Sequence, residues 1–538
     1  MSSKQTIQLK ISSGDHAQTL AATPGQCLRD LLDAADLRVR TACLGQGACG
    51  LCLVRLQGAA LPPPTPAEAL HIAPEALADG VRLACQLWPE GDLAVEILRP
   101  APLSVWKSVP LTEQAAASPR PPRHGRPIPP GLHHPLAAAV DLGTTNIRIA
   151  LLDLLSGRWL AECLGGNPQT RSGADVLSRL TCAVVSLASA AGLARLASDA
   201  IGQGLAELAG RYGIDLQRVA ALAIVGNSAM LSLLANDRVG RLLDPAHWMA
   251  PLECRPADPA AWARDWAIHP QARIELVQPL AGFVGSDLLA GLVSTGLLRG
   301  PAPALLLDLG TNSEVALWDG DRLWVTSAAG GPAFEVSGYS SGIPAEPGAI
   351  GRVGRAADGS LRYGVLGETA AKGLCGSGLV DLVARLREGG ELKVNGRFAA
   401  ADEFRLPDLG GPPLHLTLHD VDQLQQAKAG IGAAVAVLCR HSGLRPEVLA
   451  RLWVAGEFGR FLDPASAMAI GLLPRVPVER VRLNGDAALA GCAELLLQEE
   501  AAAELERVRG LARIVNLALE PDFGDLFIRN LFLREMAV

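Results

Sequence analysis

Four cysteines near the start of the chain have a spacing that suits an iron–sulfur cluster. Cys43, Cys49 and Cys52 lie in the stretch TACLGQGACGLC, and Cys85 follows in VRLACQL. Four thiolates can hold a [2Fe–2S] cluster, and a long gap before the last one is natural when three share a loop. Glycines between them allow the positive φ angles and close backbone approach that wrapping a cluster requires. The spacing therefore predicts a [2Fe–2S] site.

The same stretch also matches G-x-G-x-x-G, the pattern of a dinucleotide-binding turn, through Gly45, Gly47 and Gly50. Such a turn must open a helix, whereas the next residues, LCLVRLQGAALPPPTP, indicate a short strand and then prolines. We favour the cluster, with a dinucleotide and structural zinc as the alternatives. The other cysteines show no paired spacing and are interpreted as packed thiols. They are Cys27, Cys163, Cys182, Cys254, Cys375, Cys439 and Cys492.

A second pattern that could do chemistry occurs twice, as AAAVDLGTTNIRIALLD and as ALLLDLGTNSEVALWD. In each copy an apolar run that predicts a strand ends at an aspartate, Asp141 and then Asp308. A Gly-Thr turn there would present N–H groups and hydroxyls to phosphate, while the carboxylate could hold Mg²⁺ through water. The echo predicts a duplicated α/β domain with two related halves.

Two such loops resemble the phosphate loops of the actin, sugar kinase and Hsp70 ATPase superfamily, in which ATP lies between the halves. RLWVAGEFGRFLD resembles its adenosine loop, where Gly456 and Gly459 would let the backbone approach the nucleoside; a purely structural role for turn glycines is the alternative. VGNSAM, which contains Asn227, and GLCGSGLVDL resemble its two connecting motifs. No G-x-x-x-x-G-K-[ST] stretch is present, so a P-loop ATPase is not expected.

Other polar residues carry less specific signals. Asp287, Glu314 and Glu335 lie in glycine-rich stretches, where a carboxylate could position water or Mg²⁺ or could equally have a structural or capping role. HLTLHD places His415 and His419 four residues apart. The alternating leucines predict a strand with both histidines on one face, and a metal site is not expected there.

The chain divides into three parts. Residues 1–99 contain the pattern of a hairpin, a helix and two further short strands, and with the cysteine loop they resemble the adrenodoxin-like [2Fe–2S] ferredoxins of the β-grasp fold. Residues 100–135 are rich in proline, which favours an extended linker. Residues 136–538 hold both aspartate loops. The predicted fold class is an α/β multidomain protein, with a ferredoxin-like domain, a linker and a duplicated actin-like (ribonuclease H-like) ATPase domain.

Size and charge set further limits. A chain of 538 residues exceeds one hydrophobic core, and its net charge of −7 does not indicate a nucleic-acid partner. The N-terminus lacks the pattern of a secretory signal, and no apolar run is long enough to cross a membrane. We therefore predict a cytoplasmic protein without a membrane partner, whose cysteines are not a disulfide framework.

A ferredoxin domain joined to an actin-like ATPase resembles the reductive activators of corrinoid proteins. The resemblance runs from about residue 137 to the end, through stretches such as NPQTRSGADVLSRL and PDFGDLFIRNLFL. It implies an ATP-hydrolysing enzyme that returns inactive Co(II) to the Co(I) that methyl transfer requires, using one electron from the cluster. The implied partners are a corrinoid (cobalamin-binding) protein of a methyltransferase system and an electron-donating reductase or reduced ferredoxin or flavin. The resemblance also allows a homodimer.

The resemblance implies three cofactors, a [2Fe–2S] cluster, ATP and Mg²⁺. Asp141 and Asp308 would be catalytic residues that hold Mg²⁺, and Asn227 would lie near the nucleotide. The residues assigned to phosphate are Gly143, Thr144, Thr145, Asn146, Gly310, Thr311 and Asn312. Two other functions stay open at this point, a small-molecule kinase with a fused redox domain and a redox-sensing, ATP-binding switch.

Overall fold

The computed structural model of the chain forms two compact units. The first comprises residues 1–105 and 168–179, and the second comprises 106–167 and 180–538. The structure describes residues 6–13, 16–35, 37, 39, 47, 49–57, 62–100, 106–109, 128–256, 258–330 and 338–538.

The first unit is built on a five-stranded mixed sheet in the order β2-β1-β5-β3-β4. β1 pairs antiparallel with β2 and parallel with β5, so the hairpin and the last strand lie side by side. Its strands and helices are β1 (Ile7–Ser13), β2 (His16–Ala22), α1 (Leu28–Ala34), β3 (Leu53–Gln57), α2 (Pro66–His71), α3 (Pro74–Ala78), β4 (Val81–Leu83) and β5 (Leu93–Ile97).

The alternation of apolar residues explains this sheet. In β1, Ile7, Leu9 and Ile11 are buried while the residues between them face outward, which gives a sheet with one covered face. The predicted hairpin, helix and two later strands are confirmed. The sequence did not indicate α2 and α3; α2 begins at a proline with a capping box between Thr65 and Glu68.

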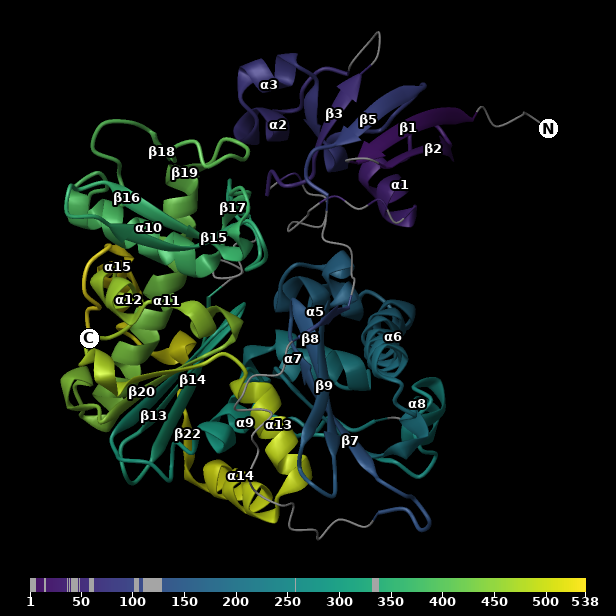
Figure 1. Ribbon diagram of the computed structural model, residues 1–538, viewed down its shortest axis with the longest axis vertical. Coiled ribbons are helices and arrows are strands. Elements are labelled where there is room, and N and C mark those ends of the chain that lie inside the picture. Colours follow the sequence, from purple (N-terminus) through teal and green to yellow (C-terminus); the bar gives the residue numbers. More distant parts are fainter. Residues whose placement is uncertain are drawn as a thin grey trace. The chain divides into compact units, whose positions relative to one another are not determined.

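The second unit contains two six-stranded sheets with the same core connectivity. The first half has the order β11-β10-β7-β8-β9-β6 and the second β21-β20-β12-β13-β14-β22. In each sheet, three strands form an antiparallel meander. A fourth strand then pairs in parallel with the first, and a fifth pairs in parallel with the fourth. The internal echo of the sequence thus corresponds to two copies of one topology (Figure 1).

The first half supports its sheet with helices on both faces, which explains why strand β7 is buried along its length. Its longest helix, α6, is capped at its start by Ser186, whose side chain accepts from the Ser189 N–H, and at its end by Gly213 in the left-handed conformation. The elements are β6 (Lys107–Ser108), β7 (Leu136–Leu142), β8 (Asn146–Asp153), β9 (Trp159–Gly166), α5 (Val176–Val184), α6 (Leu187–Tyr212), β10 (Val219–Gly226), α7 (Ser228–Ala235), α8 (Pro259–Asp265) and β11 (Arg273–Leu276).

The second half carries further elements between β14 and β20, including a three-stranded sheet and two long helices. Its sheet strands are β12 (Ala304–Leu309), β13 (Asn312–Trp318), β14 (Leu323–Ala329), β20 (Arg451–Ala455), β21 (Val481–Asn484) and β22 (Ala512–Ile514). The other elements are β15 (Ala349–Arg355), β16 (Leu361–Val365), β17 (Gly373–Leu374), α10 (Gly376–Gly389), β18 (Glu403–Arg405), β19 (His415–Thr417), α11 (Leu418–Ser442), α12 (Pro464–Ala469), α14 (Glu499–Leu511) and α15 (Phe523–Leu531).

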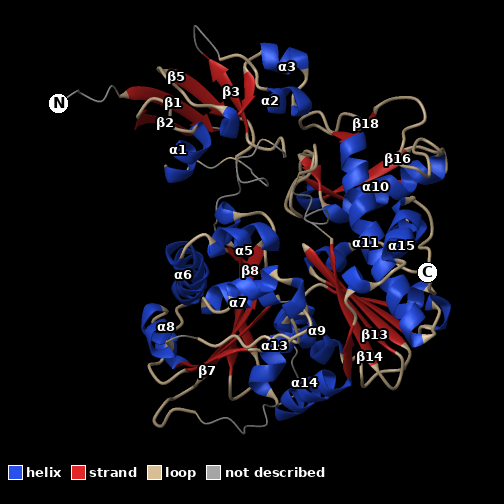
Figure 2. Ribbon diagram, turned by 180° about the vertical axis from the view of Figure 1, so that it is seen from behind, coloured by secondary structure: helices blue, strands red, loops and turns tan. Residues whose placement is uncertain are grey.

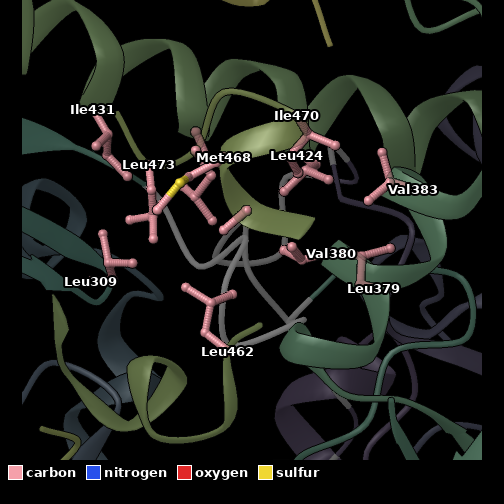
Figure 3. Close-up of a cluster of buried hydrophobic side chains, with 14 of the residues drawn as sticks. Leu309, Leu379, Val380, Val383, Leu424, Ile431, Leu462, Met468, Ile470 and Leu473 are labelled. Atoms are coloured by element: carbon pink, nitrogen blue, oxygen red, sulfur yellow. The ribbon is translucent and has the colours of Figure 1, made fainter. Parts of the chain in front are cut away.

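The core of the second half joins these added helices to the sheet. Figure 3 shows Leu309 at the end of β12 on one side, with Val380 of α10 and Leu424 of α11 on the other. All three side chains are fully buried or nearly so. One continuous apolar cluster therefore holds the second phosphate loop against the helices that follow it.

Two helices connect the halves, α9 (Ser286–Thr295) and α13 (Ala487–Leu497). α9 contacts β10 of the first sheet and β12 of the second, while α13 follows β21 and contacts β7 and β10. Figures 1 and 2 both show them between the sheets. A Cβ on Gly491 would lie 1.9 Å from the Ala290 carbonyl oxygen, so their contact requires glycine.

The connecting helices differ from those that the sequence suggested. VGNSAM forms the start of α7, which contacts α6 and β10 of its own half, and GLCGSGLVDL opens α10, which contacts β15 and α12 of its own half. The expectation for HLTLHD was also wrong: His415 lies in β19, but His419 lies in α11. The reason is a capping box between Thr417 and Asp420, which starts the helix.

Part of the predicted linker is built into the ATPase unit. Lys107 and Ser108 form β6, an edge strand that pairs with β9. The side chain of Trp106 is 7% exposed, and Cβ atoms on Gly165 and Gly204 would each come within 2.7 Å of its indole. The two glycines thus form a slot for this indole. No helix of the described residues is long and apolar enough to span a membrane.

We expect Trp106→Ala to lower the thermal unfolding temperature of the second unit, because burying this side chain contributes on the order of 3–5 kcal/mol. Trp88→Ala is the matched control, since Trp88 is 53% exposed in the first unit. Calorimetry of the two variants checks the prediction. Equal melting profiles would show that the indole does not hold β6 to the ATPase sheet.

Candidate functional site

The two predicted phosphate loops face each other in the second unit. The hydroxyls of Thr145 and Thr311 lie 3.2 Å apart, one from each half. Each loop turns sharply at its glycine: a Cβ on Gly143 would lie 2.6 Å from the Asn146 carbonyl oxygen. The duplicated topology therefore brings together residues that are far apart in the sequence, as the echo of the sequence predicts.

Carboxylates from three elements gather beside these loops. Asp308 ends β12, Glu314 is its direct partner in the ladder with β13, and Asp287 lies in the first turn of α9. Burial raises the pKa of Asp308 to about 7, and the charge of Asp141 from the other half adds to this rise. Burial and the charge of Asp308 likewise raise the pKa of Asp287 to about 7.

The carboxyl group of Glu314 is the most strongly affected of the cluster. Burial and then the charges of Asp287 and Asp308 raise its pKa well above the usual value, despite a hydrogen bond from the Ser327 hydroxyl at 3.2 Å. Like charges in a low-dielectric site repel strongly unless a cation compensates them. Oxygen ligands of this kind suit Mg²⁺. The sequence left Glu314 and Asp287 with a structural role as an alternative, and Glu335 lies outside the described residues.

Asn227 lies against the first phosphate loop. It caps α7 by accepting from the Met230 N–H, and its amide donates to the Thr144 hydroxyl over 2.9 Å. Gly285 lies close by, since a Cβ there would come within 2.5 Å of the Asn227 Cα. The turn that carries Asp287 is thus held directly against the residue that contacts the loop.

The glycines of the predicted adenosine loop make close contacts within the protein. Gly456 has a φ of +85°, and a Cβ there would lie 2.3 Å from the Leu309 carbonyl oxygen and 3.0 Å from Asp308 Oδ1. A Cβ on Gly459 would approach the backbone of the preceding strand, β20, at Val454. Close packing within the protein therefore explains why both positions are glycine. Gly456 also places this loop beside the second aspartate, Asp308.

A network of charges links the two halves near the loops. Arg148 stands opposite Asp141 in the β7–β8 ladder, and its buried guanidinium binds both Glu162 of β9 and Asp486. Asp486 comes immediately before α13, and its other oxygen lies 4.0 Å from Arg460. The first phosphate hairpin is therefore joined to the start of a connecting helix, and through it to the loop after β20.

The first unit brings together three of the four predicted cluster cysteines, Cys49, Cys52 and Cys85. The thiol of Cys52 donates to Cys85, which lowers the pKa of Cys85 to about 6, and the backbone of Gly47 and the side-chain amide of Gln86 also donate to Cys85. Cys49 is close enough to influence Cys52 electrostatically. Cys43 lies outside the described residues, among which no three possible metal ligands form a ready group.

Comparison with known families assigns both units. Residues 12–90 match the model described as 2Fe-2S iron-sulfur cluster binding domain, 136–300 match RACo middle region, and 302–538 match C-terminal domain of RACo the ASKHA domain. A relative from Eubacterium limosum, "Corrinoid activation enzyme RamQ", is 30% identical over 73% of this chain and 69% of its own length. The chain belongs to the RACo family.

Two further similar proteins agree with this membership. "[Co(II) methylated amine-specific corrinoid protein] reductase" from Methanosarcina barkeri is 29% identical over 67% of this chain and 70% of its own. The solved structure "Reductive activator for corrinoid,iron-sulfur protein" is 25% identical, covers 99% of both chains and has a TM-score of 0.67. The RACo family match confirms the ferredoxin-like domain and the actin-like ATPase fold.

Sequence reasoning missed several residues that this RACo family member places at the site. Arg148 and Asp486 carry no motif, and only their meeting in space reveals them. Asn167 donates its side-chain amide to the Gly143 carbonyl oxygen over 2.8 Å. Asn167 is the first residue of the stretch NPQTRSGADVLSRL, and nothing in that stretch indicates a contact with a phosphate loop.

The raised pKa values predict a pH dependence of stability. An acid whose pKa is higher folded than unfolded loses its stabilising protonated form as pH rises through 7. Asp287→Asn keeps the acceptor for the Leu288 N–H but carries no charge. We expect the nucleotide-free variant to melt a few degrees above wild type at pH 8, with a smaller gain at pH 5. The exposed Asp321 supplies the control, Asp321→Asn, and equal gains at both pH values would contradict the assignment.

A double-mutant cycle tests the link between the halves. We expect Arg148→Met and Asp486→Asn to show a coupling free energy on the order of 1–3 kcal/mol in unfolding experiments, because each substitution removes the same charged contact between the two side chains. The exposed pair Arg475 and Glu535 is the control, for which coupling should be below about 1 kcal/mol. Additive effects at Arg148 and Asp486 would show that they do not hold the halves together.

Proposed function

We propose that this protein is an ATP-dependent reductive activator of a corrinoid protein, which delivers one electron to an inactive Co(II) centre and so restores Co(I) for methyl transfer. One observation carries the proposal: a single chain joins a cysteine-lined ferredoxin-like unit to two opposed phosphate loops, and it does so along the full length of a solved reductive activator. The electron is supplied by a reductase or by a reduced ferredoxin or flavin.

The cysteines of the first unit fit a [2Fe–2S] cluster. Donors from Gly47 and Gln86 point at the sulfur of Cys85, the arrangement that stabilises thiolate ligands. Cys43, Cys49, Cys52 and Cys85 would hold the cluster, which when bound supplies a one-electron redox centre.

The second unit fits MgATP. Asp141 and Asp308 would hold Mg²⁺. Asp287 and Glu314 lie close enough for the charge of Asp308 to raise their pKa values. The loop residues from Gly143 to Asn146 and from Gly310 to Asn312 would bind the phosphates by N–H groups and hydroxyls. The like charges of these buried carboxylates repel one another, and this repulsion favours the binding of a cation. A small-molecule kinase and a redox-sensing switch are not favoured, because the relatives' names describe corrinoid activation.

The test uses the reduced protein, MgATP and a Co(II) corrinoid-binding protein of a methyltransferase system. We expect the Co(I) absorption spectrum to appear only with ATP. Cys49→Ser should lose the visible absorption of the cluster and all Co(I) formation while keeping its affinity for ATP. Cys182→Ser, a partly exposed cysteine of the ATPase unit, should keep all three properties.

Each negative outcome of this test contradicts a different part of the proposal. Absence of Co(I) with wild-type protein and any such partner would contradict the proposed reaction. Loss of both visible absorption and ATP binding in Cys49→Ser would contradict the division of labour between the two units. Loss of visible absorption in Cys182→Ser would contradict the assignment of the cluster to the first unit.

A further inference from the structure

One segment of the ATPase sequence belongs to the redox unit. Residues 168–179 follow β9 directly, yet they form one compact unit with residues 1–105. The segment ends inside α5, which continues to Val184 in the second unit. The chain thus leaves the ATPase unit after Asn167 and returns to it within a continuous helix.

The segment has a defined internal structure. Arg179 is fully buried and its Nε donates to the Gly173 carbonyl oxygen over 2.8 Å, while the Ser178 N–H is bound by Asp175 at 2.8 Å. Gly173 has a φ of +155°, and a Cβ there would lie 2.4 Å from the Ser178 hydroxyl. These contacts hold the middle of the segment, at Gly173, against its last residues, Ser178 and Arg179.

Asn167, the residue before the segment, is bound to the first phosphate loop at two points. Its backbone N–H donates to the Thr145 carbonyl oxygen over 2.7 Å, and its side-chain amide donates to the Gly143 carbonyl oxygen over 2.8 Å. The residue is 1% exposed. Any change in the backbone of this loop therefore acts directly on the chain that enters the segment.

The duplication shows that this side-chain bond is special to the first half. Asn167 follows the last paired residue of β9, and Gly330 follows the last paired residue of β14, so the two positions correspond. A Cβ on Gly330 would lie 3.3 Å from the Gly310 carbonyl oxygen, and glycine has no amide to donate. The bond to the phosphate loop is present only in the half that leads to residues 168–179.

We propose that Asn167 is a positioning residue that couples the nucleotide state of the first phosphate loop to the redox unit through residues 168–179. The inference rests on the proposed function. Nucleotide can shift this segment only as far as the bonds of Asn167 differ between nucleotide states. The same coupling must act in reverse, so the state of the redox unit affects nucleotide affinity.

The experiment compares full-length, cluster-loaded Asn167→Ala with wild type. Three quantities are measured: ATP hydrolysis with its KM, Co(I) formed per ATP hydrolysed, and the change that MgATP produces in the visible circular dichroism of the cluster. We expect the visible absorption of the cluster to stay at the wild-type level, the Co(I) yield per ATP hydrolysed to fall about tenfold, and the nucleotide-dependent dichroism change to disappear.

Two other variants separate coupling from simple damage. Gly173→Ala strains the segment without touching the phosphate loop and should show the same loss of coupling. Asn516→Ala removes an asparagine that binds the Ala518 N–H elsewhere in the ATPase unit, and it should behave as wild type. If Asn167→Ala does not fold, Gly173→Ala carries the test.

A wild-type yield and dichroism change in Gly173→Ala, or an effect of Asn167→Ala on KM alone, would overturn the inference. Failure of the proposed reaction is distinguishable, because wild type would then form no Co(I). The dichroism change on adding MgATP would still report coupling between the units.

Discussion

The repulsion between buried carboxylates is the constraint on which the nucleotide site depends. Asp287, Asp308 and Glu314 come from three different elements and are all buried, which raises the pKa of each of them. The charge of Asp308 raises the pKa values of Asp287 and Glu314 further, and the charge of Asp141 does the same for Asp308. No fold would gather these groups for stability alone. The glycine contacts at Gly285 and Gly456 hold the surrounding turns close enough to keep the carboxylates together.

The two halves share a topology but divide the charge unequally. The residue opposite the first aspartate, Asp141, is Arg148, whereas the residue opposite Asp308 is Glu314. Negative charge therefore collects on the side of the second half, and the first half contributes a guanidinium already bound to two acids. A cation at this site would be drawn to the second half, while the ion network ties the first half to the connecting helix α13.

Sequence patterns predicted those strands and helices whose formation depends on residues close together in the chain. Alternating apolar residues predicted β1, the apolar runs before the two aspartates predicted β7 and β12, and the stretch GLCGSGLVDL predicted the start of α10. Helices α9 and α13 could not be recognised as connectors, because their contact depends on Gly491 and Ala290 meeting from distant parts of the chain. The ion pair of Arg148 and Asp486 escaped for the same reason.

Separate units make a mechanical link necessary. A plant-type [2Fe–2S] centre lies near roughly −400 mV, and reducing a Co(II) corrinoid is harder still, so electron delivery must be tied to the free energy of ATP. Free energy reaches another part of a protein only through elements with two arrangements that the nucleotide distinguishes. The carbonyl oxygens of Gly143 and Thr145 in the first phosphate loop accept from Asn167, so our proposal requires this turn to differ between nucleotide states. The segment that follows Asn167 is short and covalently continuous with the ATPase unit at both ends, so it is the direct covalent route between this loop and the redox unit.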